Sequence, residues 1–174
     1  MPQRRPTRLK SFDYVGEHEY FVTCCVHARQ EPFVDAETVE RVRAEFIYTC
    51  EERYFFSRVC TLMPDHIHFL VRGEMPDASF LPFMKVLRQR TAVAYRNLRG
   101  GRLWQAGYFE RVLRPRDDWN AVAQYILQNP VRATLAETAE EYPFSYLGHS
   151  EISIRDASIS ASMSTSIVGL NRTH

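Results

Sequence analysis

The sequence predicts an α+β fold in which helices pack on one face of an antiparallel sheet. Strand-like and helix-like apolar patterns follow one another in the order β-α-β-β-α-β, and a further short helix comes after them. The chain has 174 residues, of which 45% are hydrophobic and 25% are charged, as in most globular proteins. This length favours a single domain with its own hydrophobic core.

The first strand and the first helix have clear patterns. Residues 18–26, HEYFVTCCV, are rich in β-branched and aromatic side chains, which predicts a strand with a largely buried face. Asp35 is suited to cap a helix that runs to about Glu52. The apolar residues of this helix recur at helical spacing, and they are Val39, Val42, Phe46 and Cys50.

Two strands and a second helix follow. The strands cover about residues 54–62 and 66–72, and Pro64-Asp65 marks the turn between them. The second helix spans about residues 78–98, and the glycine pair at 100–101 ends it.

A fourth strand and a third helix complete the pattern. Residues 108–113, YFERVL, alternate as a strand, and either Asp117 or Asp118 caps a helix over residues 119–128 that Pro130 ends. The expected core stripe of this helix consists of Trp119, Val122, Ala123 and Ile126. The order of elements is that of a ferredoxin-like, or RRM-like, sandwich, whose uncovered sheet face is open to a ligand.

We expect three parts along the chain. Residues 1–13 form a basic arm, residues 14–145 the folded domain, and residues 146–174 a Ser-rich tail with little apolar periodicity. Four isoleucines in the tail leave open an edge strand there, and they are Ile152, Ile154, Ile159 and Ile167.

The charge is distributed unevenly, although the net charge of the chain is only +1. Between Lys85 and Arg116, nine basic residues accompany one acidic residue, so this stretch has a net charge of +8. Such a basic region favours a polyanion as partner. Arginine, which binds phosphate with a two-pronged fork and stacks on bases, greatly outnumbers lysine, although a codon bias would produce the same excess.

The four cysteines contain no C-x-x-C pair, so neither a zinc knuckle nor a disulfide framework is indicated. Free thiols fit a reducing compartment. The basic N-terminus is not followed by an apolar segment, and no apolar run is long enough to span a membrane. We therefore expect a cytoplasmic protein without a membrane partner.

A pair of histidines lies at the start of the third strand, in the segment MPDHIHFLVR. Side chains alternate between the faces of a strand, so His66 and His68 lie on the same face. Two neutral imidazoles on a rigid strand supply two ligands of an open metal site. The spacing alone equally allows two ordinary core or surface histidines.

Two polar side chains meet near the end of the third helix. Tyr125 lies off the apolar stripe, and Asn129 lies one turn later on the same side. A hydroxyl and a carboxamide are thereby presented together. From the residues alone, the reading in which Tyr125 borders the core and Asn129 caps the helix is favoured over a functional one.

Four segments between residues 20 and 133 resemble a known family in their order and spacing. They are MPDHIHFLV at 63–71, LWQAGYFER at 103–111, DW at 118–119 and YILQNPVRA at 125–133. Together they are similar to the IS200-like single-tyrosine transposases, and most similar to the REP-associated tyrosine transposases. The family's pattern often continues with glycine after NPVRA, where this chain has Thr134.

The resemblance implies a ferredoxin-like HUH nuclease that cleaves single-stranded DNA and transfers strands through a 5′-phosphotyrosyl intermediate. By this resemblance Tyr125 is the nucleophile, and His66 and His68 are catalytic ligands of Mg²⁺ or Mn²⁺. Asn129 is implied as the third metal ligand, with Gln128 as the alternative. No residue is identified as the base that deprotonates the tyrosine.

The implied partner is single-stranded DNA that carries a short palindromic hairpin with a flanking tetranucleotide, bound by a monomer, with a dimer as the alternative. We expect DNA contacts from aromatic and basic side chains, with a core position as the alternative for Trp104. These residues are Arg4, Arg5, Arg8, Lys85, Arg88, Trp104, Tyr108, Arg111 and Arg114. Two rival functions stay open: an RRM-like binding module without cleavage, and a hydrolase of small phosphoesters.

Overall fold

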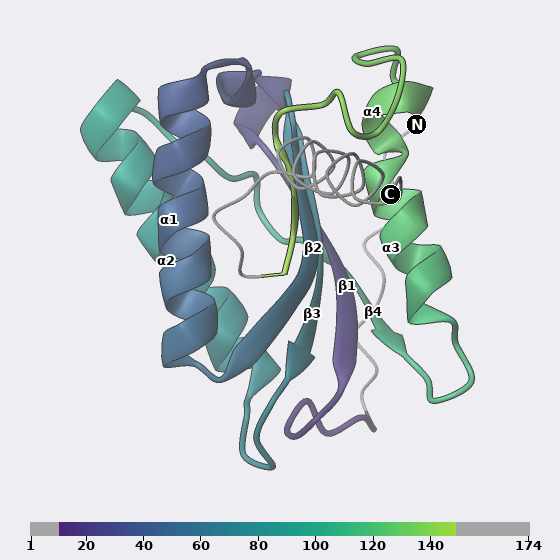
Figure 1. The fold of residues 1–174 in the computed structure, drawn as a ribbon. Helices are drawn as coiled ribbons and strands as arrows, with labels where there is room; N and C mark the ends of the chain where they lie inside the picture. The colour runs from purple at the N-terminus through teal and green to yellow at the C-terminus, as the bar shows by residue number, and fades with distance from the viewer. Residues whose placement is uncertain (1–10, 149–174) are drawn as a thin grey trace, which may run out of the picture.

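The computed structural model of the chain describes residues 11–148. Within this part, five antiparallel strands form one sheet in the order β4-β1-β3-β2-β5 (Figure 1). The strands are β1 (Glu19–Cys25), β2 (Phe55–Met63), β3 (His66–Gly73), β4 (Phe109–Leu113) and β5 (Ser145–Leu147). The first four have the order and directions of a ferredoxin-like sheet, so the predicted fold class is confirmed.

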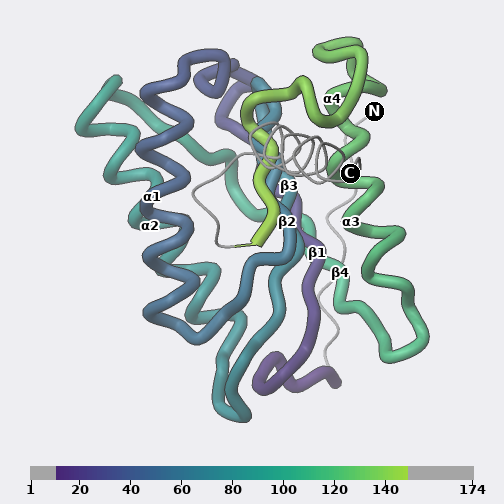
Figure 2. Tube along the Cα trace, viewed as in Figure 1, coloured from purple at the N-terminus to yellow at the C-terminus, as the bar shows by residue number. Residues whose placement is uncertain are grey.

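Two long helices cover one face of the sheet, as Figures 1 and 2 show. They are α1 (Ala36–Glu52) and α2 (Phe80–Arg99). The Asp35 side chain accepts a hydrogen bond from the Thr38 backbone N–H and caps α1 as predicted. The second helix ends at Gly100, whose φ of +75° is a conformation that favours glycine.

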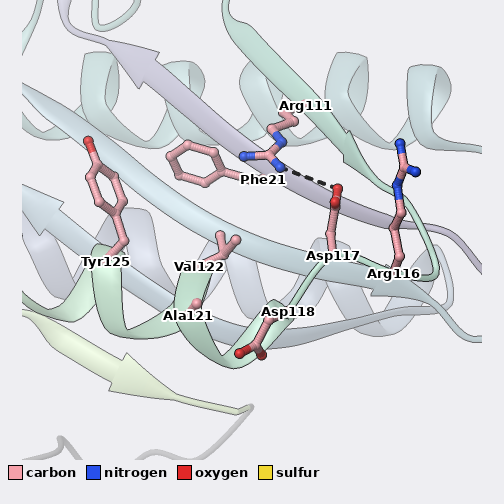
Figure 3. Close-up of a pocket in the computed structure, with 8 residues that line it drawn as sticks. All are labelled: Phe21, Arg111, Arg116, Asp117, Asp118, Ala121, Val122 and Tyr125. Atoms are coloured by element: carbon pink, nitrogen blue, oxygen red, sulfur yellow. Dashed lines mark hydrogen bonds and ion pairs between the residues drawn. The ribbon is translucent and has the colours of Figure 1, made fainter.

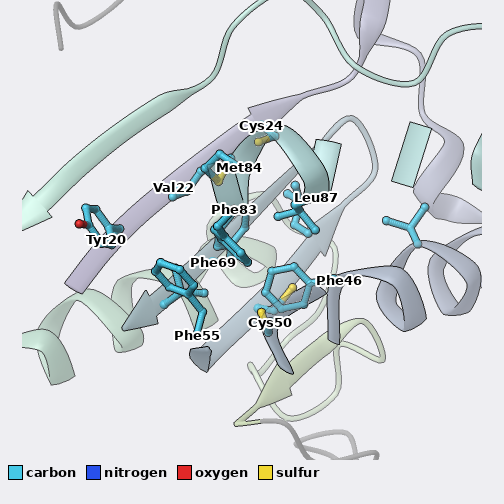
Figure 4. Close-up of a cluster of buried hydrophobic side chains, with 14 of the residues drawn as sticks. Tyr20, Val22, Cys24, Phe46, Cys50, Phe55, Phe69, Phe83, Met84 and Leu87 are labelled. Carbon is cyan, nitrogen blue, oxygen red and sulfur yellow. The ribbon is translucent and has the colours of Figure 1, made fainter. Parts of the chain in front are cut away.

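The main core lies between these helices and the sheet (Figure 4). Aromatic side chains dominate it, and the rings of Tyr20 and Phe80 stack with their centroids 3.8 Å apart. Phe46 of α1 packs on Phe69 of β3, and Phe55 stacks on Phe83 of α2. These contacts hold β3, the strand of the two histidines, at the centre of the sheet.

The third helix, α3 (Trp119–Leu127), packs on the opposite face of the sheet (Figure 1). The prediction that the helices pack on one face is therefore correct for α1 and α2 only. The opposite sheet face presents Val59, Leu70 and Leu113, which are buried against apolar side chains of α3. Burying this apolar patch favours the placement of α3, and it leaves only part of that face open.

The core stripe of α3 also differs from the prediction. Ala123 and Ile126 are buried as expected, but Trp119 is 37% exposed and lies under the Arg58 guanidinium, 4.0 Å from its ring centroid. Leu127, which was not predicted, belongs to the buried cluster, and Trp119 does not. Asp118, rather than Asp117, caps the helix and accepts a hydrogen bond from the Asn120 N–H.

Two short elements near the end of the described chain were not predicted. A one-turn helix, α4 (Asn129–Arg132), follows α3 directly, so Pro130 begins a new turn there. The strand β5 pairs with β2 and crosses the predicted domain boundary between residues 145 and 146. The folded domain therefore extends to Leu147 at least.

At the other end, Phe12 already packs against the core, so the predicted arm of residues 1–13 is at least two residues too long. The rest of the arm, and residues 149–174 of the predicted tail with its isoleucines, lie outside the described residues. Within residues 11–148, the helices are too short or too polar to cross a bilayer.

Candidate active site

The two histidines of β3 face each other at the end of the strand nearest α4. Their Nε2 atoms are 3.0 Å apart, and both rings lie on the sheet face that α3 partly covers, as the strand parity predicts. The strands β1 and β2 flank this position, so the pair rests on the middle of a five-stranded sheet. Two ring nitrogens thus converge on one point from a rigid element.

A carboxylate orients the first histidine. The Asp65 Oδ1 atom lies 2.5 Å from His66 Nδ1, and Asp65 Oδ2 accepts a hydrogen bond of 2.7 Å from Arg29. An ionised carboxylate can only accept, so His66 Nδ1 carries the proton of this hydrogen bond. Burial raises the pKa of Asp65, but the hydrogen bonds from His66 and Arg29 outweigh this effect. The pKa of Asp65 therefore lies below its usual range.

A hydroxyl orients the second histidine. Thr23, which lies opposite His68 in the register of β1 and β3, places its Oγ1 atom 2.8 Å from His68 Nδ1. His68 is only 8% exposed. This burial, together with His66 and Arg132, lowers the pKa of His68 to about 3. The ring is therefore neutral at physiological pH, the form that binds a cation.

A divalent metal ion fits this pair. Two ligands at right angles in an octahedral shell, each about 2.1 Å from the ion, lie about 3.0 Å apart, which matches the separation of the two Nε2 atoms. Within the described residues, no group of three or more His, Cys, Asp or Glu side chains is arranged as a metal site.

The side chain of Asn129 contacts the end of α3. Its Nδ2 atom donates to the carbonyl oxygens of Tyr125 and Ile126, at 3.0 and 3.3 Å. Because these partners accept, the amide nitrogen faces the helix end and the Oδ1 atom is turned away from it. Asn129 therefore has the helix-capping role that the sequence left open.

Tyr125 lies on α3 and shares a contact residue with the histidine pair. Its side chain is 50% exposed, and its ring packs edge-on against Phe21 of β1 with the centroids 6.0 Å apart. The His68 ring lies 5.7 Å from the same Phe21 ring. The rings of Tyr125 and His68 are therefore at most about 12 Å apart, centroid to centroid, and Phe21 connects them.

A basic side chain covers Tyr125. The guanidinium of Arg132, on α4, lies 4.2 Å from the centroid of the Tyr125 ring, and it donates a hydrogen bond of 2.8 Å to the Tyr125 carbonyl oxygen. Arg132 also contributes to the lowered pKa of His68. Arg132 therefore acts electrostatically on His68 and contacts Tyr125, a position that the sequence reasoning did not assign to it.

The structure divides the predicted DNA-binding residues between the two faces of the sheet. Arg111 lines a pocket beside Tyr125, and Arg114 lines the neighbouring pocket. Lys85 and Arg88 belong to α2, on the opposite layer, where Arg88 donates to the Gln105 carbonyl oxygen. Tyr108 packs against Phe80 in the main core, also on the side of α2.

Trp104 requires a correction. It is 6% exposed, packs beside Phe33 in the main core and donates its indole N–H to Thr91 Oγ1 of α2. Such a buried, satisfied indole has no free face for a base. The core position that the sequence left open is therefore the observed one. Arg4, Arg5 and Arg8 lie outside the described residues.

Comparison with known proteins gives a family match. The model of the family described as "Transposase IS200 like" matches residues 14–129, which include both histidines, Tyr125 and Asn129. A curated protein of Haemophilus influenzae, named as a REP-associated tyrosine transposase, is 24% identical over 144 residues. That alignment covers 76% of this chain and 81% of the relative.

Two solved structures share the fold. A REP-associated tyrosine transposase bound to a REP hairpin superposes with a TM-score of 0.67 at 19% identity, over 83% of this chain and 82% of the other. A transposase structure from Deinococcus radiodurans superposes with a TM-score of 0.50 at 23% identity, over 69% of this chain and 95% of the other.

Proposed function

Because the chain belongs to the IS200-like transposase family, we propose that it is a metal-dependent endonuclease and strand transferase for single-stranded DNA that carries hairpin repeats. Tyr125 is the nucleophile, and a 5′-phosphotyrosyl adduct is the intermediate. The observation that supports this proposal most directly is the common contact of Tyr125 and His68 with the ring of Phe21. This contact supports the proposal because it brings the proposed nucleophile within about 12 Å of a proposed metal ligand.

In the first step, the hydroxyl oxygen of Tyr125 forms a bond to phosphorus while the bond from phosphorus to the 3′ oxygen breaks. The proton that leaves the phenol is balanced by the proton that the released 3′ oxygen takes up. Arg132 lies against the Tyr125 ring, where its positive charge stabilises negative charge on the phenol oxygen and on the phosphate. In strand transfer, another 3′-hydroxyl attacks the adduct and restores the tyrosine.

The metal site in this proposal consists of His66, His68 and the amide oxygen of Asn129. These residues would hold Mg²⁺ or Mn²⁺, which would supply the positive charge that polarises and orients the scissile phosphate. The ligands of this chain contribute two nitrogen donors, and Mn²⁺ accepts imidazole more readily than Mg²⁺ does. Asp65 and Thr23 orient the two rings so that both Nε2 atoms face the ion.

The DNA substrate in this proposal is a hairpin with a single-stranded flank. Two relatives support it: the Haemophilus influenzae protein is named for REP association, and the solved transposase with the same fold is bound to a REP hairpin. The site of the present chain fits a single strand, because aromatic rings and arginines lie together beside the nucleophile. Since Tyr125 and the histidines come from one chain, a monomer is sufficient.

The test is covalent capture. Protein is incubated with Mn²⁺ and a labelled oligonucleotide that contains the palindromic hairpin nearest its gene, and the adduct is measured on a denaturing gel and by mass spectrometry of the labelled peptide. We expect an adduct at Tyr125 that is lost in Tyr125→Phe. Tyr48→Phe is the matched control, because Tyr48 is also an exposed helical tyrosine under an arginine, on the opposite layer.

Other outcomes identify the rival functions. Hairpin binding by the wild-type protein with no adduct in Mn²⁺ or Mg²⁺ would indicate a binding module that does not cleave. Hydrolysis of a small phosphoester that persists in Tyr125→Phe would indicate a metal-dependent hydrolase. Either result contradicts the proposed strand transfer.

A further inference from the structure

A pocket of about 480 Å³ opens beside Tyr125, between the first turns of α3 and the strands β1 and β4 (Figure 3). Tyr125 lies at one end of it and Arg116 at the other. Its volume falls in the range of small-molecule sites, about 300 to 1,000 Å³. We propose that this pocket receives the base of one nucleotide next to the scissile phosphate, an inference that rests on the proposed function.

The floor and one wall of the pocket are apolar. Phe21 contributes a half-buried ring, and Ala121 and Val122 contribute aliphatic surface from α3. The Phe21 ring is held in place by edge contacts with Phe109 and Tyr125, each with centroids 6.0 Å apart. A flat, immobilised ring beside small aliphatic groups suits the stacking of a base, whichever base it is.

The charged groups of the pocket fit a nucleotide better than a free phosphate. Arg111 and Arg116 supply positive charge for the sugar–phosphate backbone. Asp117 and Asp118 line the same pocket, and Asp117 already accepts hydrogen bonds from Arg111, at 3.3 Å, and from the Arg114 backbone N–H, at 3.0 Å. Two carboxylates repel an isolated phosphate, whereas carboxylates accept hydrogen bonds from the amino groups of bases.

The position of Tyr125 determines which nucleotide is involved. In a reactive complex, the attacked phosphorus lies about 3 to 3.5 Å from the tyrosine hydroxyl. Tyr125 also lines the pocket, so the two nucleotides joined by that phosphate are the ones close enough to enter it. The pocket then holds a base in a fixed place and sets the position of the scissile bond.

The test measures binding without cleavage, in a Tyr125→Phe background. The probe is the hairpin oligonucleotide with an abasic site moved one position at a time along its single-stranded flank. Ala121→Trp fills the pocket from an exposed helical position, so the core is left intact. Ala44→Trp is the matched control, because Ala44 is an exposed helical alanine that lines a groove between α1 and α2, on the opposite layer.

We expect one flank position at which the abasic site raises Kd about tenfold, as the loss of a stacked base does. Ala121→Trp should raise Kd for the intact oligonucleotide to a similar extent, and the abasic site should then have no further effect. Ala44→Trp should leave Kd unchanged. The proposal is overturned if Ala121→Trp, shown to be folded by circular dichroism, binds the intact oligonucleotide like its parent.

A second measurement does not depend on a variant. The fluorescent base 2-aminopurine, placed at the sensitive position, should change its emission on binding because it leaves its neighbours and stacks on the Phe21 ring. Unchanged emission at every flank position would contradict a base pocket. Adduct formation at Tyr125 is measured separately in the wild-type protein. If the adduct forms but no abasic position changes Kd, the base pocket is refuted and the nuclease is not. If an abasic position changes Kd but no adduct forms, the nuclease is refuted and the base pocket is not.

Discussion

The hydroxyl of Thr23 and the carboxylate of Asp65 contact the Nδ1 atoms of the two histidines, so both affect which ring nitrogen can bind a cation. A ring that binds a cation through Nε2 must have its proton on Nδ1. Asp65 accepts a hydrogen bond from His66 Nδ1, and the Thr23 Oγ1 atom can accept one from His68 Nδ1. Both partners lie within 2.8 Å of their rings, so the two histidines are oriented for binding before an ion arrives.

We therefore predict that Thr23→Val weakens Mn²⁺ binding about 10- to 100-fold. Valine keeps the shape of threonine but removes the oxygen, and the buried His68 Nδ1–H then has no acceptor. The measurement is Kd for Mn²⁺ by titration calorimetry without DNA. Thr49→Val is the control, because Thr49 is a buried threonine that bonds only to the Glu45 carbonyl oxygen of its own helix. Equal Mn²⁺ affinity in Thr23→Val and wild type would show that Thr23 does not orient His68.

The sequence could predict part of this site but not all of it. The common face of His66 and His68 follows from strand parity, which is a local property. Thr23 and Phe21 join the site only through the register of β1 against β3, and no local pattern specifies that register. The sequence left Trp104 open between a stacking platform and a core position, because aromatic residues suit both. Its burial beside Phe33 and its bond to Thr91 decide for the core.

At the scale of elements, the junction of α3 and α4 positions the nucleophile. The carbonyl oxygen of Tyr125 accepts hydrogen bonds from both Asn129 and Arg132, which tie the new turn to the end of α3. The predicted end of the helix at Pro130 was a reasonable inference, because proline ends a helix that precedes it. Proline also suits the first turn of the next helix, so the residue alone does not distinguish the two outcomes.

Because Arg132 lies at this junction, we predict that Arg132→Gln slows adduct formation. Glutamine keeps a polar amide but removes the charge next to the ring. The rate of adduct formation should fall about a hundredfold, as for the loss of one group that stabilises a developing charge. The measurement is single-turnover cleavage at saturating DNA and Mn²⁺.

The control for this variant is Arg90→Gln, because Arg90 stacks on Tyr48 at 4.7 Å in the same manner, away from the site. It should leave the cleavage rate unchanged. If Arg132→Gln cleaves at the wild-type rate, Arg132 serves only to hold α4 against α3.

At the scale of the whole molecule, the sheet separates charges that are adjacent in sequence. The stretch from Lys85 to Arg116 has a net charge of +8, and the sequence suggested one DNA surface there. In the fold, Lys85 lies on α2 and Arg114 lies near the start of α3, on opposite layers of the sheet. The charge of a segment can be counted in the sequence, but the face on which each side chain lies depends on the packing of the helices.

This separation gives a prediction for salt dependence. Affinity for the hairpin oligonucleotide should fall steeply with salt, because phosphate contacts release counterions. Loss of one contact to a single strand lowers the slope of log K against log salt by about 0.7. Arg114→Ala should show this change, because Arg114 lines the pocket next to the proposed base site. Lys85→Ala should leave the slope unchanged, because the exposed Lys85 lies on α2, on the opposite side of the sheet from Tyr125.

The two variants each remove one exposed positive charge, so a general loss of net charge would affect both equally. An equal decrease in slope would therefore mean that the DNA contacts both layers.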